Sequence, residues 1–174
     1  MNNISRKTRY RVTALAAAAL AFGVVAGPAT TAQAATAQGF VNGWDNFTDD
    51  WADEGILSTT QHANSGATGL WQLVLWQDGY LSESDVDCKF GPKTQAATKK
   101  WQAHYLRASE ADGVVGNKTF GEASQHIGST DNGFSLQYGS IYIGRNVNNG
   151  EYFFHTDYTN GFVDASYTSA ANCR

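Results

Sequence analysis

DCKFGPKT, residues 87–94, is the stretch that decides the fold, because DGVVGNKT, residues 112–119, repeats its pattern twenty-five residues later. In both copies an Asp opens the loop, an apolar residue precedes a Gly, and Lys-Thr follows. A motif that recurs at a fixed spacing is typical of repeated structural units. The pair therefore predicts two similar loop-to-helix units packed around one small core.

Three helices are predicted around these loops. The first covers about residues 66–80, where apolar side chains fall on both sides, so it is either buried on both sides or binds a ligand on one. The second begins at Pro92, a favoured first helical residue, and continues to about Tyr105. The third runs from about Asn117 to Gln125. Together they form a unit of about sixty residues, a size that is only marginally stable alone.

An ordered set of motifs covers this unit, at roughly residues 66–127. The set is Trp71-Gln72, Leu75, Gly79-Tyr80, Asp87, Phe90-Gly91, Thr94, Ala97, Trp101-Gln102, Leu106, Asp112-Gly113, Val115-Gly116 and Thr119-Phe120. In order and register it resembles the peptidoglycan-binding-like domain family. The resemblance implies a three-helix module that occurs in many secreted wall hydrolases and also alone.

The chain departs from the family pattern at three positions. Trp71 and Trp101 stand where Leu and Phe are usual, and Cys88 replaces the customary Gly of the first loop. A residue other than Gly resists a positive φ angle. The conformation of the first loop is therefore the less certain part of the resemblance.

Residues 1–34 are predicted to be a secretory signal peptide. Four basic residues precede a fourteen-residue apolar stretch, Val12 to Val25, and Ala32-Gln33-Ala34 supplies a small-x-small cleavage pattern. The apolar stretch is too short for a spanning helix, although an uncleaved membrane anchor is the alternative. We expect a secreted protein, extracellular or associated with the cell wall, with no stable membrane insertion after signal removal.

The charge of the chain excludes several partners. Without the four basic residues of the leader, eight Lys and Arg stand against sixteen Asp and Glu, a balance of −8. Nucleic acids and anionic lipids are bound through basic patches, so neither is an expected partner. Recognition of a cell wall would rest on shape and hydrogen bonding.

Cys88 and Cys173 are the two cysteines of the chain. An even number in a secreted protein favours a disulfide over a free nucleophile or a metal site. The bridge would tie the penultimate residue to the first loop. A bridge between two chains is the alternative.

The module has an extension on each side. Residues 35–65 are predicted to contain a short amphipathic helix at 42–55, with acidic residues on its solvated face. A calcium site is the alternative for these acidic residues, but the segment lacks the spaced oxygen ligands of a calcium loop.

Residues 128–174 are predicted to begin with a plain linker, 128–133. A three-stranded meander follows from about Ile141 to Tyr167, with two Asn-Gly hairpin signals, and Ser135–Tyr138 is an alternative extension of it. The predicted fold class is α+β: a small three-helix peptidoglycan-binding-like module followed by a short antiparallel β-meander.

The sequence offers little for catalysis. No two histidines have zinc-protease spacing, and the usual serine-nucleophile motifs are absent. His155-x-Asp157 comes nearest to a metal pair, but a catalytic zinc needs three suitable ligands. Glu151, Asp157 and Asp164 would need a cleft to act as a glycosidase pair. The sequence thus predicts a protein that is not an enzyme and has no metal or cofactor.

The resemblance implies a non-catalytic protein that binds peptidoglycan, through its glycan or its stem peptide. The candidate contacts are loop residues and two aromatic neighbours: Tyr80, Asp87, Lys89, Tyr105, Asp112 and Lys118. Each has a structural alternative, because loop Asp side chains often close their own turns and Tyr105 lies on the predicted core face.

A second hypothesis belongs to a different class: a scaffold or protein-partner-binding protein that keeps the module's fold without wall binding. It is motivated by Cys88 and by the flanking segments, which would cover the groove. The exposure of Trp76, Tyr80 and Tyr105 on one connected surface should discriminate between the two hypotheses.

Overall fold

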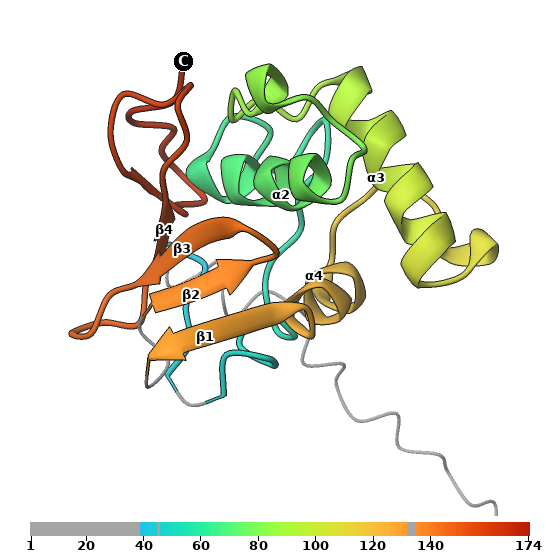
Figure 1. Ribbon diagram of the computed structural model, residues 1–174. Coiled ribbons are helices and arrows are strands. Elements are labelled where there is room, and N and C mark those ends of the chain that lie inside the picture. Colours follow the sequence, from blue (N-terminus) through green and yellow to red (C-terminus); the bar gives the residue numbers. More distant parts are fainter. Residues whose placement is uncertain (1–38, 45, 132–134) are drawn as a thin grey trace, which may run out of the picture.

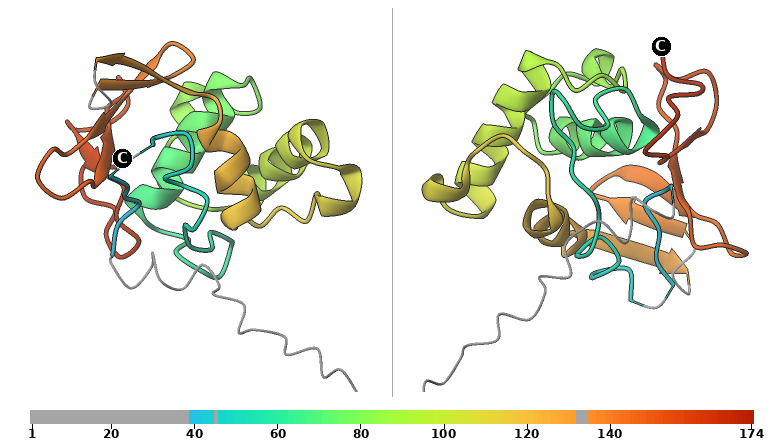
Figure 2. Two further views of the ribbon diagram at one scale, coloured as in Figure 1. Left: turned by 90° about the horizontal axis from the view of Figure 1, so that it is seen from below. Right: turned by 180° about the vertical axis from the view of Figure 1, so that it is seen from behind.

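The computed structural model describes residues 39–44, 46–131 and 135–174. Within them, three α-helices precede a sheet of five antiparallel strands (Figures 1 and 2). This corrects the predicted fold class, because the C-terminal part is not a short meander of three strands. The predicted signal peptide lies outside the described residues. None of the helices in the described part of the chain has the length and apolarity that a membrane span requires.

Helix α2 (Gly66–Gln77) lies at the centre of the molecule. The Ser65 hydroxyl caps its N-terminus by accepting a hydrogen bond from the Thr68 backbone N–H at 3.1 Å. Every residue from Gly66 to Leu75 is buried, with the sheet on one side of the helix and α3 on another (Figure 1). The apolar residues on both sides of α2 therefore pack against protein.

The repeated sequence folds as two copies of one structural unit. The 3-10 helices η1 (Glu83–Asp85) and η2 (Ala108–Glu110) precede the two loops at the same offset of twenty-five residues. Each loop leads into an α-helix, first α3 (Pro92–Tyr105) and then α4 (Asn117–Ser124). The predicted start of α3 at Pro92 is confirmed. Helix α3 belongs to both copies, because it ends the first unit and begins the second.

The five strands follow one another in sequence order across the sheet. They are β1 (Ile127–Asp131), β2 (Ser135–Tyr138), β3 (Ile141–Arg145), β4 (Tyr152–Phe154) and β5 (Val163–Asp164). The buried side chains of β2 to β5 alternate with exposed or partly exposed ones along most of each strand; they include Leu136, Tyr138, Ile141, Ile143, Tyr152, Phe154 and Val163.

Strand β1 occupies most of the segment that was predicted as a plain linker. It pairs with β2 through residues such as Gly128 opposite Gln137. Ile127 is buried, whereas Gly128, Ser129 and Thr130 are exposed, so no alternation of apolar side chains marks the strand in the sequence. Main-chain pairing with a neighbour defines this strand, and local sequence does not show that pairing.

Residues 47–53 form turns, and the described part of the predicted amphipathic helix at 42–55 is not helical. Two carboxylates point inward: Asp50 is 8% exposed and Glu54 is 0% exposed. Asp50 accepts hydrogen bonds from Arg145 Nη1 and the Tyr152 hydroxyl, each at 2.6 Å. The prediction of a solvated acidic face is therefore wrong for Asp50, which is held by side chains of β3 and β4, and for Glu54, which accepts from the Tyr167 hydroxyl and the Asn42 N–H.

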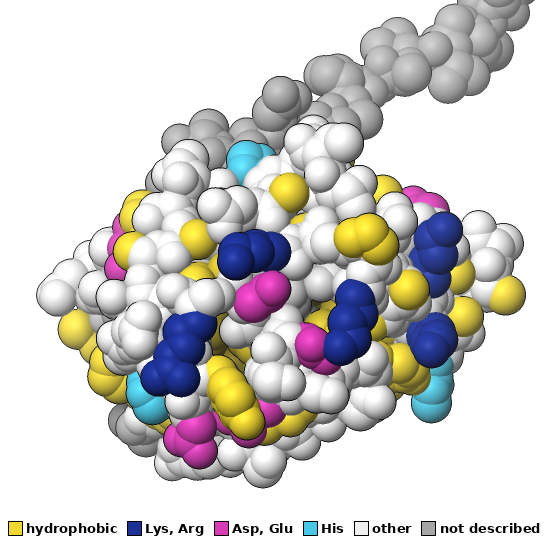
Figure 3. Space-filling model, turned by 90° about the horizontal axis from the view of Figure 1, so that it is seen from above, with side chains coloured by type: hydrophobic (Ala, Val, Ile, Leu, Met, Phe, Trp, Pro, Cys, Tyr) yellow, Lys and Arg dark blue, Asp and Glu magenta, His cyan; other side chains and the backbone are white. Residues whose placement is uncertain are grey.

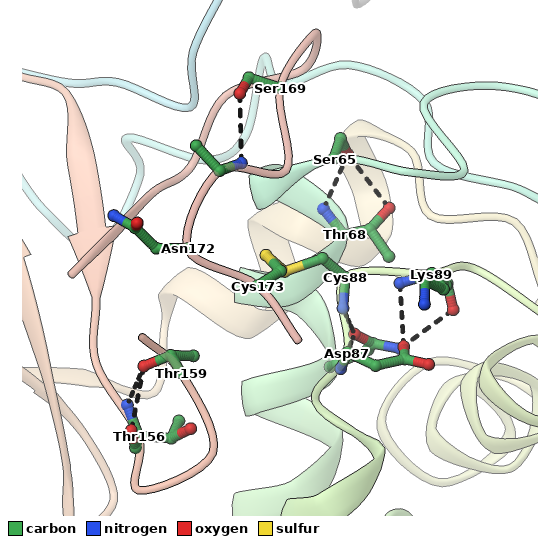
Figure 4. The surroundings of a disulfide bond; sticks show 12 residues. Ser65, Thr68, Asp87, Cys88, Lys89, Thr156, Thr159, Ser169, Asn172 and Cys173 are labelled. Carbon is green, nitrogen blue, oxygen red and sulfur yellow. Dashed lines mark hydrogen bonds between the residues drawn. A yellow bond between two sulfur atoms is a disulfide. The ribbon is translucent and has the colours of Figure 1, made fainter. Parts of the chain in front are cut away.

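The predicted disulfide is confirmed. Cys88 of the first loop is bonded to Cys173, 85 residues later, and Figure 4 shows the C-terminal segment lying against that loop. Gly69 on α2 makes room for the bridge, since a Cβ atom there would lie 2.5 Å from Cys88 Sγ and 2.6 Å from Phe154 Cζ. The bridge and the sheet thus meet at one point on α2.

Candidate binding groove

Two buried glutamines shape the two loops. In the first loop, Gln72 Nε2 donates to Asp87 Oδ1 at 2.9 Å, to the Lys89 carbonyl at 3.1 Å and to Thr94 Oγ1 at 3.0 Å. Gln72 Oε1 accepts from the Cys88 backbone N–H at 2.8 Å. One side chain of α2 therefore fixes the loop at both ends.

Gln102 of α3 repeats this arrangement in the second loop. Its Nε2 donates to Asp112 Oδ1 at 3.2 Å, to the Val114 carbonyl at 2.8 Å and to Thr119 Oγ1 at 3.1 Å. Its Oε1 accepts from the Gly113 backbone N–H at 2.8 Å. The two loops are therefore built by the same four-part hydrogen-bond network.

The aspartates that open the loops close their own turns. Asp87 Oδ1 accepts from the Lys89 N–H at 2.9 Å, and Asp112 Oδ1 accepts from the Val114 N–H at 2.8 Å. The structural alternative for these two residues is confirmed. The residue after each Asp has a positive φ, 62° at Cys88 and 78° for the Gly of the second loop. Cys88 thus adopts a left-handed conformation that favours Gly.

A groove of ≈ 280 Å³ lies beside the second loop. Its apolar walls include Ile56, Leu106 and Val114. Ile56 is held there because its neighbour Leu57 exchanges two backbone hydrogen bonds of 2.9 Å with Val115 of the loop. The groove is therefore framed by a rigid loop on one side and by the N-terminal extension on another.

A second hollow of ≈ 490 Å³ continues the groove. Both are lined by Leu106, Glu110 and Lys118, and the second also by Tyr105 and Arg107. Lys118 Nζ donates to Glu110 Oε1 at 3.2 Å where the two hollows meet. We call the two hollows together the second-loop groove.

The first loop has different surroundings. Asp87 and Lys89 line neither hollow of the second-loop groove. Cys173 lies against the loop, and the Ser65 N–H donates to the Cys88 carbonyl at 3.1 Å (Figure 4). The six predicted contact residues are therefore divided. Tyr105, Asp112 and Lys118 line the groove, Asp87 and Lys89 belong to the disulfide-bonded loop, and Tyr80 lines neither hollow.

The two predicted aromatic contacts, Tyr80 and Tyr105, both contact His104. The Tyr80 hydroxyl is 2.9 Å from His104 Nδ1, and the Tyr105 ring stacks on the rings of both His104 and Trp101 at 4.6 Å. Burial, together with the nearby Asp78 carboxylate, raises the pKa of both tyrosine hydroxyls. Both rings, like that of Trp76, are partly buried, so the flanking segments do not fully cover them.

Charges are mixed on the face that is seen from above in Figure 1. Lys and Arg side chains lie apart from one another there, among acidic and hydrophobic ones (Figure 3). This face therefore carries no continuous basic patch of the kind that binds polyanions.

The candidate metal ligands of the described residues are their His, Cys, Asp and Glu side chains. Among them, no group of three or more His, Cys, Asp or Glu side chains is placed to hold a metal ion. His155 and Asp157, the pair noted in the sequence, are both exposed. The described residues therefore do not offer the three protein ligands that a catalytic zinc requires.

Comparison with known proteins gives one informative similarity. The chain is 32% identical over 126 residues to a zinc D-Ala-D-Ala carboxypeptidase from Streptomyces albus G, and the aligned region covers 69% of this chain and 45% of the relative. The chain thus spans less than half of that enzyme. Neither a family model nor a solved structure matches the chain. Because the relative is an enzyme, the similarity contradicts the sequence-based prediction that this protein is not one.

Sequence reasoning missed the residues that build the groove. Gln72 and Gln102 belong to the motif set but have no predicted role there, and Ile56, Leu106 and Glu110 are not among the predicted contacts. A signal for the glutamines was present, since the Trp-Gln pair recurs thirty residues apart. Ile56 carried no such signal, because its place depends on pairing between the extension and the loop.

Proposed function

We propose that this chain is a secreted protein that binds peptidoglycan of the bacterial cell wall through the second-loop groove. The observation that carries the proposal is a continuous groove whose wall is a loop held by Gln102. That loop is fixed before any ligand arrives, by four hydrogen bonds from one side chain. A preformed site binds with less loss of conformational entropy.

Two similarities support peptidoglycan as the partner. The ordered motifs of residues 66–127 resemble the peptidoglycan-binding-like domain family. The relative from Streptomyces albus G is named for its action on D-Ala-D-Ala, the dipeptide that ends peptidoglycan stem peptides. The disulfide supports an extracellular location, since such bonds persist in oxidising compartments.

The test is co-sedimentation of the oxidised protein with purified, acid-stripped peptidoglycan sacculi. An unrelated acidic protein of similar size serves as the control. We expect clear retention of this chain in the pellet. Retention no greater than that of the control would contradict the proposal and favour the scaffold hypothesis.

The same experiment has a second readout, because the relative is an enzyme. The supernatant is analysed for released muropeptides and free D-Ala, with and without added Zn²⁺. Binding is judged from the pellet and cleavage from the supernatant, so the two properties are measured separately.

A further inference from the structure

We infer that the second-loop groove binds the stem peptide of peptidoglycan and not its glycan, with Lys118 holding a peptide carboxylate. This inference rests on the proposed function. It assigns a chemical class to the ligand of that same site and gives the two loops different roles.

The charges around the groove fit a zwitterionic ligand. Its lining contains both basic residues, Lys118 and Arg107, and acidic ones, Glu110, Asp112 and Glu122. A stem peptide ends in a carboxylate and carries amino groups, whereas the sugar backbone of the glycan has no positive charge. Complementary charges set the specificity of an interface, and this pattern favours the peptide.

Lys118 is the group best placed to bind a carboxylate. Its side chain is 75% exposed, and Nζ donates to Glu110 Oε1 at 3.2 Å. An ammonium group has three N–H donors, so the ion pair leaves donors for a ligand. Glu110 and Asp112 on the same rim provide oxygen atoms for an amino group of the peptide.

The apolar wall suits small side chains. Ile56, Leu106 and Val114 line the groove of ≈ 280 Å³, and each is partly exposed. Alanine methyl groups fit a shallow apolar surface of this kind, with polar groups at the rim fixing the orientation of the ligand.

The aromatic residue of the groove is poorly placed for a sugar. Pyranose rings bind proteins by stacking on an open aromatic face. The Tyr105 ring already stacks on Trp101 at 4.6 Å and on His104 at 4.6 Å. A sugar would be a third stacking partner and would have to compete with these two rings for the Tyr105 faces.

The first loop supplies a matched control for Lys118. Lys93 stands at the same place in the repeat, its Nζ lies 2.6 Å from Asp85 Oδ1, and its side chain is 71% exposed. It lines neither hollow of the groove. Lys93→Met and Lys118→Met thus remove the same charge from equivalent ion pairs.

The test is calorimetric titration of the oxidised protein with three probes. They are a synthetic stem pentapeptide ending in D-Ala-D-Ala, the same peptide with a C-terminal amide, and peptide-free glycan strands. We expect binding of the pentapeptide, affinity about tenfold weaker for the amide or for Lys118→Met, and less than about twofold change for Lys93→Met, since a charge-assisted hydrogen bond is being removed. Sedimentation with sacculi is run on the same samples.

The outcomes separate the inference from the proposed function. Retention on sacculi with equal binding of bare glycan strands, or with equal loss in both lysine variants, overturns the inference and leaves wall binding intact. No retention on sacculi overturns both. Circular dichroism of the two variants shows whether each is folded, and Lys118→Arg should restore binding of the pentapeptide.

Discussion

At the scale of single residues, the loops depend on two glutamines more than on the aspartates that mark them in the sequence. Gln102 satisfies the buried Gly113 N–H and the Val114 carbonyl, so Gln102→Ala leaves both without that partner. We expect a loss of about 2–3 kcal/mol in the free energy of unfolding, because unsatisfied buried polar groups are costly. Urea denaturation measures this value.

The control for this prediction is Lys100→Ala, an exposed change on the same helix. It should alter the free energy of unfolding by less than about 0.5 kcal/mol. Equal stabilities for Gln102→Ala and Lys100→Ala would show that the glutamine network does not hold the loop.

Glu54 gives a residue-scale prediction about pH. Burial raises its pKa to about 7, although hydrogen bonds from Tyr167 and from the Asn42 N–H lower it. The folded state therefore holds a proton that the unfolded state has released, and stability falls as pH rises from about 4.5 to about 7. The size of the fall is about 3 kcal/mol by proton linkage.

Glu54→Gln should remove this fall, because a neutral amide does not titrate. Urea unfolding at several pH values between 4 and 8 measures the slope, with Asp49→Asn as an exposed control. A variant that keeps the wild-type slope would contradict the assignment of the pH dependence to Glu54.

At the scale of elements, the first loop combines a disulfide with an unusual backbone conformation. Cys88 has a φ of 62°, which favours Gly, and its bridge to Cys173 closes a loop of 85 residues. Loss of the bridge in Cys88→Ala/Cys173→Ala should cost about 4–5 kcal/mol in the chain-entropy model.

Replacing the cysteine with glycine tests the backbone separately. Cys88→Gly/Cys173→Ala should be more stable than the double alanine variant by about 1 kcal/mol, because Gly adopts a positive φ without steric penalty. Thermal or urea unfolding compares the two. A less stable glycine variant would show that the φ angle at residue 88 carries no strain.

The elements that the sequence predicts well are those with local causes. Pro92 and the apolar periodicity after it mark α3. The two Asn-Gly pairs, at 149–150 and 160–161, reflect a local turn preference, and each lies between two consecutive strands of the sheet. The missed elements have distant causes. Strand β1 exists through pairing with β2, and the turns at residues 47–53 place Asp50 inward, where it meets Arg145, ninety-five residues away.

At the scale of the whole molecule, three tyrosines join the C-terminal part to the rest of the chain. Their hydroxyls donate to buried or partly buried carboxylates: Tyr138 to Asp78 at 2.8 Å, Tyr152 to Asp50 at 2.6 Å and Tyr167 to Glu54 at 2.5 Å. One buried cluster includes side chains from both parts. The helices and the sheet therefore depend on each other for stability.

This arrangement predicts one cooperative unfolding transition. Far-ultraviolet circular dichroism, which follows the helices, and tyrosine and tryptophan signals, which follow the packed core, should give the same midpoint. Two separate midpoints would mean that the three-helix module unfolds independently of the sheet.

The candidate site could be predicted in part. The repeated motif identified both loops, and the structure brings Tyr105, Asp112 and Lys118 to one groove. Sequence alone could not separate the two loops, because their motifs are nearly equivalent. The difference arises from Cys173 at the far end of the chain, which lies against the first loop and leaves the second open.

The most direct test of the central claim is nuclear magnetic resonance of the ¹⁵N-labelled, oxidised protein titrated with soluble muropeptides. If the second-loop groove is the binding site, the amide signals of residues 113–119 shift and those of residues 88–94 stay in place. The two segments are equivalent in the repeat, so each serves as the reference for the other. Shifts confined to residues 88–94, or to the sheet, would contradict the account.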